Sequence, residues 1–349
     1  MPLNRRDFLK LGLGACLLPA IGHSRAENLV SEQMYVFGTL VDVEVSATDS
    51  MAAREAIAAV SQDFIRQNRE WHAWKPGALN DLNLALAAGR AHEADPYLLP
   101  LLHEVKQLAR ASGGLFNPAI GRLVGKWGFH DDLLPGGALP TSDALLPELA
   151  VLPGMDDVII DGNCVSSRNP HVQIDLGGYA KGVALDRALD RLSGLGFGNA
   201  LVNLGGNLAV SGDRGGRPWR IGVRHPQGEG ALASLEISGR SAVITSGTYE
   251  RYREQDGHRY AHIIDPRTGR PAMHVASATV IHADAARADV AATALVVAGP
   301  DQWAEIARSL GVNEVMIVDD AGRVQLTSAM ANRVEFVAQP VSVKIVELC

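Results

Sequence analysis

The spacing of apolar residues changes along the chain, and this change restricts the fold more than any other feature. Within residues 34–46, valines alternate with acidic residues, which predicts a half-buried strand. Residues 51–69 instead place their apolar side chains on one helical stripe, and residues 98–109 repeat that pattern until a Gly-Gly pair ends it. The chain is therefore predicted to pack amphipathic helices against strands with one buried face.

Short strands and helices follow one another irregularly through the rest of the chain. The strict strand–helix repeat of a doubly wound nucleotide-binding fold is missing. We therefore predict the α/β (α+β) class, with mixed, largely antiparallel sheets and packed helices. Two polar stretches, 75–95 and 133–141, are predicted as surface loops, the first with a short helix. The other predicted strands are 157–161, 172–176, 199–204, 219–224, 233–237, 241–245, 276–282 and 314–318, and the other predicted helices are 179–193, 286–298 and 301–310.

The composition is that of a globular protein that needs no metal or disulfide merely to fold. The chain has 349 residues, of which 47% are apolar and 20% charged. Such a length can bury one large core or the cores of two fused lobes. The net charge is −7 and the basic residues form no cluster, so we predict no nucleic-acid partner.

Residues 1–26 are predicted to be a twin-arginine export signal that is not part of the fold. Paired arginines, Arg5 and Arg6, precede Phe-Leu-Lys and an apolar run over 11–21, and small residues up to Ala26 suit a signal peptidase. The run is shorter than the roughly 20 residues that span a bilayer. We therefore expect a periplasmic protein whose mature domain is 27–349.

Two alternatives remain for this N-terminal segment. It could be an amphipathic first helix, although Pro19 and Gly22 interrupt it, or Cys16 could be a lipidation site, which we favour less than cleavage after residue 26. The mature domain would keep Cys164 and Cys349, which lie in no nucleophile motif and are expected to be inert; whether they pair stays open.

A first candidate site lies where the predicted strand 172–176 runs into a helix. Gly177 and Gly178 would let a ligand approach the backbone closely, and the free N–H groups at the helix start suit an anion such as phosphate. Such a Gly-Gly helix entry also occurs for purely structural reasons, and no Walker or G-x-G-x-x-G pattern is present.

A second candidate site lies on the predicted helix 286–298. Asp289 and Thr293 are four residues apart, so their side chains share one helical face. A carboxylate in so apolar a helix is costly to bury unless a cation offsets it, and a hard ion such as Mg²⁺ accepts a carboxylate and a hydroxyl. Alternatively, Asp289 caps the helix or forms an ion pair with Arg287 or a distant arginine. The spacing does not distinguish these roles from a metal ligand.

A third candidate site follows the segment 245–249. His262 borders a short apolar pair and a Pro-containing turn, where its position would be fixed, so it could accept a proton near neutral pH. His258 is the less favoured histidine because it follows Asp256-Gly257, a predicted hairpin tip. Most histidines in such places are simply hydrogen-bonded core or turn residues.

Several segments together resemble the ApbE family of FAD:protein FMN transferases. The resemblance runs in the same order from Gly38-Thr39 to about residue 335, nearly the whole predicted mature domain. The segments that carry it are Asp175-Leu176-Gly177-Gly178-Tyr179-Ala180-Lys181-Gly182, Asn203-Leu204-Gly205-Gly206-Asn207, Thr245-Ser246-Gly247, His262-Ile263-Ile264-Asp265-Pro266-Arg267-Thr268-Gly269, and Asp289 with Thr293.

The resemblance implies an ApbE-like fold of two fused lobes around a central FAD cleft and an enzyme that transfers FMN from FAD to a Thr or Ser hydroxyl of an acceptor protein, releasing AMP. It implies that Mg²⁺ is held by Asp289, Thr293 and the Ala180 carbonyl, and that His262 is the base. Gly177, Gly178 and Lys181 would contact the phosphates. The flavin and adenine contacts would be Phe37, Trp71, His72, Ala73, Asn117, Val183 and Ile263.

The chain departs from the family pattern at a few positions. Trp71-His72-Ala73 stands where Met-Ser-Thr is common, and Ala78-Leu79 replaces a Ser-Glu pair; both changes bear on the packing and orientation of the flavin. Asn117 and Asn207 stand where Asp is usual, an amide-for-acid change. The predicted metal pair and base are unaffected.

Two other functions remain as alternatives. A Mg²⁺-dependent FAD pyrophosphatase would use water in place of the protein hydroxyl. A non-catalytic periplasmic FAD-binding protein would bind FAD without turning it over. An oxidoreductase is disfavoured because paired cysteines or a second redox motif are missing. The acceptor is not readable from the sequence; export favours a partner that faces the periplasm, such as a membrane-bound respiratory or nitrous-oxide-related flavoprotein.

Overall fold

The computed structural model describes residues 29–131, 134 and 137–348. The predicted signal 1–26, the alternative lipidation site Cys16, and Cys349 lie outside the described residues. Cys164 is exposed and unpaired with any described cysteine. Within the described ranges, every helix is too short or too polar to cross a bilayer.

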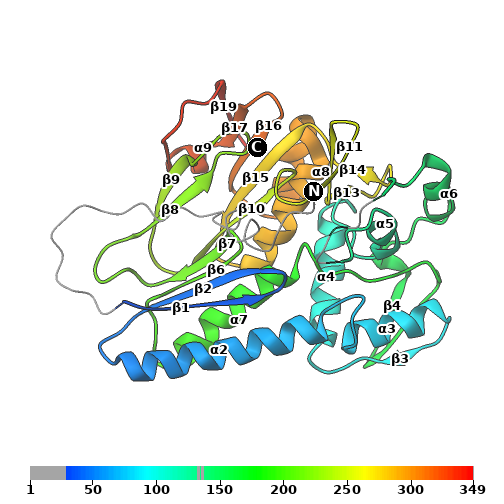
Figure 1. The fold of residues 1–349 in the computed structure, drawn as a ribbon, viewed down its shortest axis with the longest axis horizontal. Coiled ribbons are helices and arrows are strands. Elements are labelled where there is room, and N and C mark those ends of the chain that lie inside the picture. The colour runs from blue at the N-terminus through cyan, green and yellow to red at the C-terminus, as the bar shows by residue number, and fades with distance from the viewer. Residues whose placement is uncertain (1–28, 132–133, 135–136, 349) are drawn as a thin grey trace.

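A nine-stranded sheet forms the centre of the fold (Figure 1). Neighbouring strands in this sheet are antiparallel throughout, except that the last pair, β17 and β19, is parallel. The predicted class, α/β with largely antiparallel sheets, is confirmed. In order across the sheet the strands are β1 (Leu29–Val36), β2 (Thr39–Ser46), β6 (Ala200–Leu204), β7 (Asn207–Ser211), β10 (Ser241–Gly247), β15 (Val275–His282), β16 (Glu314–Asp319), β17 (Arg323–Thr327) and β19 (Ser342–Val346).

The two faces of this sheet bury separate cores because successive side chains of a strand point to opposite sides. In β10, Ile244 packs into a core shared with the helices α2 (Ser50–Glu70), α7 (Ala180–Gly194) and α8 (Ala285–Ser309). Its neighbour Val243 packs against the other face, where a three-stranded sheet lies. The strands of that smaller sheet are β18 (Val334–Phe336), β9 (Ala231–Ile237) and β8 (Trp219–Arg224).

Smaller elements extend the helical side of the molecule, at the right in Figure 1. A small third core around Trp127 and Leu123 ties some of them together. They are α3 (Ala78–Ala87), β3 (His92–Glu93), α4 (Leu99–Ala111), α5 (Gly121–Lys126), α6 (Ser142–Ala150), η1 (Met155–Asp157), β4 (Val158–Asp161) and β5 (Cys164–Ser167). Two short hairpins, β11 (Tyr252–Gln255) with β12 (His258–Ala261) and β13 (Ile264–Asp265) with β14 (Arg270–Pro271), and the short helix α9 (Ser328–Ala331), complete the described elements.

The predicted strand 172–176 is wrong. Its residues form only an isolated bridge between Ile120 and Gln173. Other groups satisfy this extended backbone: Gln173 and Asp175 donate their N–H groups to the carbonyls of Ala119 and Pro118. The segment is therefore an extended approach to α7 without a ladder partner.

Other predicted elements differ in their boundaries, and one helix was missed. Residues 34–46 form parts of two strands because Phe37 and Gly38 turn the chain, with φ values of 54° and 70°. Helix α6 begins at Ser142, directly after the predicted loop. It was not predicted, because Pro147 interrupts the helical pattern of its sequence. The helices predicted at 286–298 and 301–310 join as α8, with a break at Gly299 (φ 76°).

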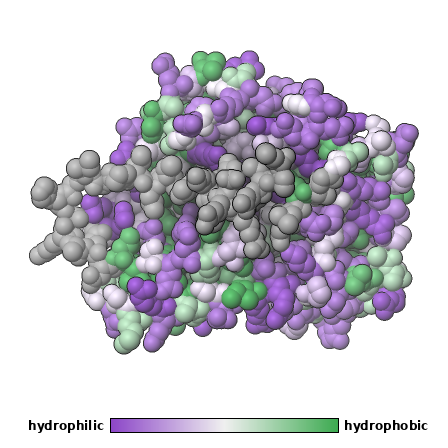
Figure 2. Space-filling view, viewed as in Figure 1, coloured by the Kyte–Doolittle hydropathy of each residue, from purple (hydrophilic) through white to green (hydrophobic). Residues whose placement is uncertain are grey.

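The visible surface is mostly hydrophilic, with hydrophobic residues scattered among polar ones (Figure 2). This distribution is ordinary for a globular protein.

Candidate active site

The start of helix α7 lies against helix α8 because two glycines remove the side chains between them. A Cβ at Gly182 would lie 2.3 Å from the Ala285 carbonyl oxygen, and a Cβ at Gly178 would lie 3.0 Å from Thr293 Oγ1. Gly178 and Gly182 therefore permit a close approach that other residues would block. The N-cap residue Tyr179 makes no side-chain cap, and two N–H groups at this helix start are satisfied by carboxylates: Gly177 donates to Asp175 and Gly182 to Asp289.

Asp289 lies at this contact between the helices. Its side chain is only 2% exposed, and its two carboxylate oxygens accept hydrogen bonds from Gly182 N–H (3.0 Å) and from Asn207 Nδ2 (3.3 Å). Asn207 in turn accepts a hydrogen bond from Thr245 N–H (3.3 Å). The carboxylate is thus fixed from both α7 and the central sheet.

The alternative local roles of Asp289 are excluded. Asp284, rather than Asp289, caps α8 by accepting the Arg287 N–H (2.8 Å). The Arg287 guanidinium lies beside Asp284 and donates to the Leu310 carbonyl. Within the described part of the chain, Asp289 forms no ion pair with an arginine.

Thr293 faces the same helix start, one turn along α8 from Asp289. Its hydroxyl lies 3.3 Å from the hydroxyl of Ser246, which projects from β10. Thr293 and Ser246 are both half-buried, whereas Asp289 is almost fully enclosed. The predicted shared face of Asp289 and Thr293 is therefore aimed at the start of α7.

These oxygen donors fit a hard divalent cation. Burial raises the pKa of the Asp289 carboxyl, while Lys181 and the Gly182 N–H act in the opposite direction. A cation beside the carboxylate would offset the cost of burying its charge. No cluster of three or more His, Cys, Asp or Glu side chains suited to a metal occurs among the residues placed by the structure, so the protein alone offers a sparse donor set. Such a set suits Mg²⁺, which takes few protein ligands and completes its shell with substrate phosphates and water.

His262 lies at the end of the β11–β12 hairpin with its imidazole half-buried. Its Nδ1 lies 3.1 Å from the Arg251 carbonyl oxygen, which can only accept, so Nδ1 carries the proton and Nε2 keeps its lone pair. Burial lowers the pKa of His262 to about 4, and the nearby charge of Lys181 acts in the same direction. The imidazole is therefore neutral at physiological pH. His258 is exposed beside the predicted hairpin tip, where Asp256 and Gly257 have positive φ.

The predicted flavin contacts Phe37, Trp71, His72 and Ala73 lie at two turns on the helical side of the sheet. Phe37 packs edge-on against Phe64 of α2 (6.0 Å between ring centroids). Trp71 is 4% exposed and stacks on Tyr97, with the Arg187 guanidinium 5.0 Å from its ring. His72 accepts two backbone N–H bonds through Nδ1, and Ala73 is buried. A direct role of these four residues in flavin binding stays a prediction.

The other predicted ligand contacts surround the start of α7 or follow His262. Asn117 uses its amide to bridge Pro153 and Ala119, and its neighbour Phe116 lies beside Gly178. Val183 and Ile263 are 6% exposed. Gly177 is exposed, whereas Ala180 and Lys181 are half-buried.

Asn83 connects the 71–73 turn to the approach of α7 and was not predicted. Its side chain donates to the Ala73 and Ile174 carbonyls and accepts the Ile174 N–H, which is 91 residues away in the sequence. Asn207 and Ser246 stood within recognised segments, but their contacts with Asp289 and Thr293 were also not predicted. The sequence signal for Asn207 and Ser246 is their place in the recognised segments, whereas Asn83 is marked only by being a polar residue among the leucines of 79–86.

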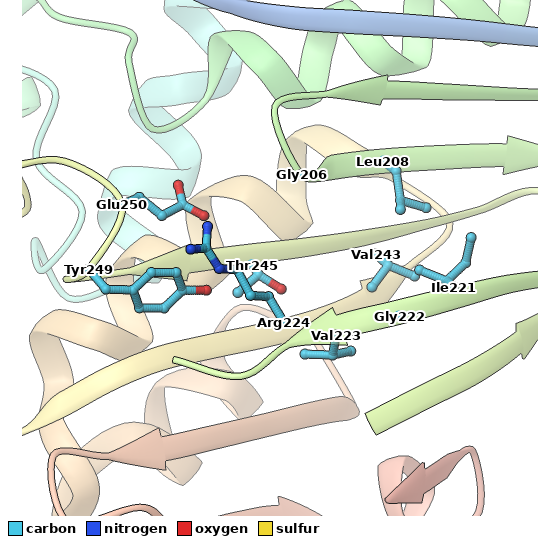
Figure 3. A pocket seen from close by; sticks show the side chains of 10 residues that line it. All are labelled: Gly206, Leu208, Ile221, Gly222, Val223, Arg224, Val243, Thr245, Tyr249 and Glu250. Atoms are coloured by element: carbon cyan, nitrogen blue, oxygen red, sulfur yellow. The ribbon is translucent and has the colours of Figure 1, made fainter. Parts of the chain in front are cut away.

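A small pocket opens on the other face of the sheet at the end of β10 (Figure 3). Arg224, Tyr249 and Glu250 lie at one end of it, and apolar side chains including Leu208 and Val243 lie at the other. The Arg224 guanidinium carbon lies 5.4 Å from the Tyr249 ring centroid. Glu250 connects this pocket to the Asp289 site, because burial raises the pKa of its carboxyl and the charges of Lys181 and Asp289 also act on it.

A buried carboxylate, a hydroxyl and a neutral imidazole near a glycine-lined helix start are groups typical of sites that take phosphate-containing ligands. The chain belongs to the ApbE family, whose model matches residues 37–317.

Relatives and a solved structure agree with this membership. A FAD:protein FMN transferase of Rhodobacter capsulatus is 45% identical over 322 residues, which cover 91% of this chain and 61% of that protein. A FAD:protein FMN transferase of Treponema pallidum is 33% identical over 357 residues, covering 94% and 95% of the two chains. The crystal structure of an ApbE protein from Thermotoga maritima has a TM-score of 0.80 at 30% identity, covering 89% of this chain and all of that one. The chain spans about three fifths of the length of the R. capsulatus relative.

Proposed function

We propose that the protein is a Mg²⁺-dependent FAD:protein FMN transferase that moves FMN from FAD to a Thr or Ser hydroxyl of an acceptor flavoprotein and releases AMP. The observation that carries this proposal is the convergence of Asp289 and Thr293 on the glycines of α7. Two relatives that share most of this chain's length bear the name of this activity.

Asp289, Thr293 and the Ala180 carbonyl would hold the Mg²⁺ ion. When bound, this ion neutralises phosphate charge and stabilises the negative charge that develops on the leaving group. The residues of the chain account for the rest of the chemistry. Gly177 and Gly178 would let the FAD diphosphate approach the backbone at the start of α7, where the Gly177 N–H donates to Asp175 (2.9 Å), and the ammonium of Lys181 would help to hold it. Such placement matters because phosphoryl-type transfer depends mostly on positioning and charge neutralisation.

His262 would take the proton of the acceptor hydroxyl at Nε2, the nitrogen left free by the Nδ1 bond to Arg251. The hydroxyl oxygen forms a bond to the FMN phosphorus, and the bond between that phosphorus and the bridging oxygen breaks, so that AMP leaves with that oxygen. General-base assistance of this kind typically contributes about 100- to 10,000-fold to the rate.

We further propose that residues 1–26 direct twin-arginine export, that the domain 27–349 acts in the periplasm, and that lipidation at Cys16 is the less favoured alternative. The acceptor would then be a flavoprotein that faces the periplasm, with a membrane-bound respiratory or nitrous-oxide-related protein as the first candidate. A nucleic acid is not proposed as a partner, because the chain is acidic overall.

The decisive experiment incubates the purified protein with FAD, Mg²⁺ and periplasm-facing flavoproteins encoded in the same genome. Mass spectrometry should find FMN bound covalently to a Thr or Ser peptide, with one AMP released per FMN attached. Replacing His262 by Ala should abolish this transfer and leave FAD binding intact. Rapid repeated release of FMN and AMP without an acceptor would instead establish the pyrophosphatase, and FAD binding without turnover under any acceptor would establish the carrier.

A further inference from the structure

The hydroxyl groups of Ser246 and Thr293 form a pair between β10 and α8. Their oxygens are 3.3 Å apart, and either hydroxyl could be the donor. Because side chains alternate along a strand, Ser246 points toward α8 while Thr245 points to the opposite face, where its hydroxyl meets that of Thr279 at 2.9 Å. Within the described ranges, Ser246 is the hydrogen-bond partner found for the Thr293 side chain.

A threonine hydroxyl binds a cation through an oxygen lone pair, and its proton must then point to another acceptor. We propose that Ser246 is a positioning residue that accepts this proton from Thr293 and so directs a Thr293 lone pair toward the cation. This inference rests on the cation site of the proposed function and extends it to a residue outside the expected ligands.

The position of β10 makes this support rigid. Ser246 lies opposite Ala278 of β15, whereas on the other side β7 pairs with β10 only as far as Val243. The preceding residue of β10, Thr245, donates its N–H to Asn207, and Asn207 donates to Asp289. Two successive residues of one strand therefore fix the two side chains expected to bind the cation, Asp289 through Asn207 and Thr293 directly.

Ser246→Ala tests the proposal because it removes only the acceptor hydroxyl from a half-buried position. We would measure the binding of Mn²⁺, a paramagnetic stand-in for Mg²⁺, to the FAD-loaded protein by electron paramagnetic resonance. Partners that orient metal ligands typically change affinity about 10- to 100-fold, so Mn²⁺ should bind at least about 10-fold more weakly. FAD affinity in the absence of metal should stay unchanged.

Two matched variants separate positioning from a general effect on the sheet. Ser246→Thr retains the hydroxyl and should recover most of the Mn²⁺ affinity. Thr279→Val removes a hydroxyl from the pair on the opposite face and should bind Mn²⁺ like the original protein. If Ser246→Ala misfolds, the Ser246→Thr variant still tests the proposal. If Ser246→Thr loses as much Mn²⁺ affinity as Asp289→Ala does, although it keeps the hydroxyl, the proposal is overturned.

The result also distinguishes this inference from the proposed function. Unchanged Mn²⁺ affinity in folded Ser246→Ala would overturn the positioning role even if FMN transfer occurs. Weakened Mn²⁺ affinity in a protein that never transfers FMN would support the positioning role and count against the transferase.

Discussion

His262 can act as a base only in its neutral form, and its surroundings keep it neutral. Burial and the charge of Lys181 lower its pKa to about 4, well below the ordinary value of 6.5. Because the pKa is lowered, the imidazole stays unprotonated until the pH falls through about 4, and only then loses the Nε2 lone pair. The Arg251 carbonyl fixes which nitrogen carries that lone pair.

The transfer rate should therefore be nearly independent of pH between 8 and 6 and should fall only below about pH 5. Single-turnover rates with saturating FAD and Mg²⁺, measured across this range, check the prediction. Samples held at the lowest pH and assayed at pH 7 control for acid unfolding. A rate that falls with a midpoint near 6.5 would mean that His262 is solvated like a free imidazole or that another group is the base.

Asp289 and Asn207 offer a second test at single residues, because their hydrogen bonds require one acid and one amide at the two positions. In Asp289→Asn, an amide NH₂ must face one of two donors, Gly182 N–H or Asn207 Nδ2. This should lower the free energy of unfolding by about 1–3 kcal/mol. The swap Asn207→Asp with Asp289→Asn restores every donor–acceptor pair, because the carboxylate introduced at position 207 can still accept the Thr245 N–H.

The swapped protein should regain most of the lost stability and still fail to transfer FMN, because its carboxylate no longer lies beside Thr293. Urea unfolding without metal and the transfer assay measure the two effects separately. The prediction is contradicted if Asp289→Asn alone is as stable as the original protein, or if the swap is no more stable than Asp289→Asn.

At the scale of elements, the contact between α7 and α8 depends on Gly182. A methyl group there would lie 2.3 Å from the Ala285 carbonyl oxygen and 2.6 Å from the Ala286 Cα, both parts of the rigid backbone of α8. Gly182→Ala must therefore separate the helices and move Asp289 and Thr293 away from the start of α7.

We expect Gly182→Ala to destabilise the protein by about 1–3 kcal/mol, as overpacking does, and to reduce transfer at least about 10-fold. Gly194 at the end of the same helix is the matched control, since a Cβ there meets nothing within 4 Å. Gly194→Ala should be neutral or slightly stabilising, because alanine favours the helix more than glycine does. Equal effects of the two variants on urea unfolding and on transfer would refute the close-approach argument.

The elements also show how far the sequence predicts this site. The spacing of Asp289 and Thr293 correctly predicts a shared face, because helix geometry connects residues four apart. The contacts of Asn207 and Ser246 depend on which strands pair and where α8 crosses them, and no local pattern encodes that. The segment 172–176 was misread for the same reason: its apolar alternation resembles a strand, but its backbone partners, such as the Pro118 carbonyl, belong to a loop.

At the scale of the whole molecule, the site draws on segments that are distant in the sequence. β2 pairs with β6, about 160 residues away, so that Val43 lies opposite Val202. The glycines of α7, the strands β7 and β10, and helix α8 each contribute to the contacts of Asp289 or Thr293. A ligand bound here would contact several of these segments at once, so that unfolding of the core would release it.

FAD and Mg²⁺ should therefore raise the melting temperature together, and Asp289 should be required for the Mg²⁺ part. A ligand whose free concentration is 100 times its Kd stabilises the native state by about 2.7 kcal/mol. For a chain of this size, that corresponds to a rise of about 4 °C. Differential scanning fluorimetry with FAD alone, and with FAD plus Mg²⁺, measures the two contributions. In Asp289→Ala, FAD should still raise the melting temperature, whereas added Mg²⁺ should not. If Mg²⁺ adds nothing to the original protein with FAD present, the cation does not bind at α8, and the roles assigned to Asp289 and Thr293 are wrong.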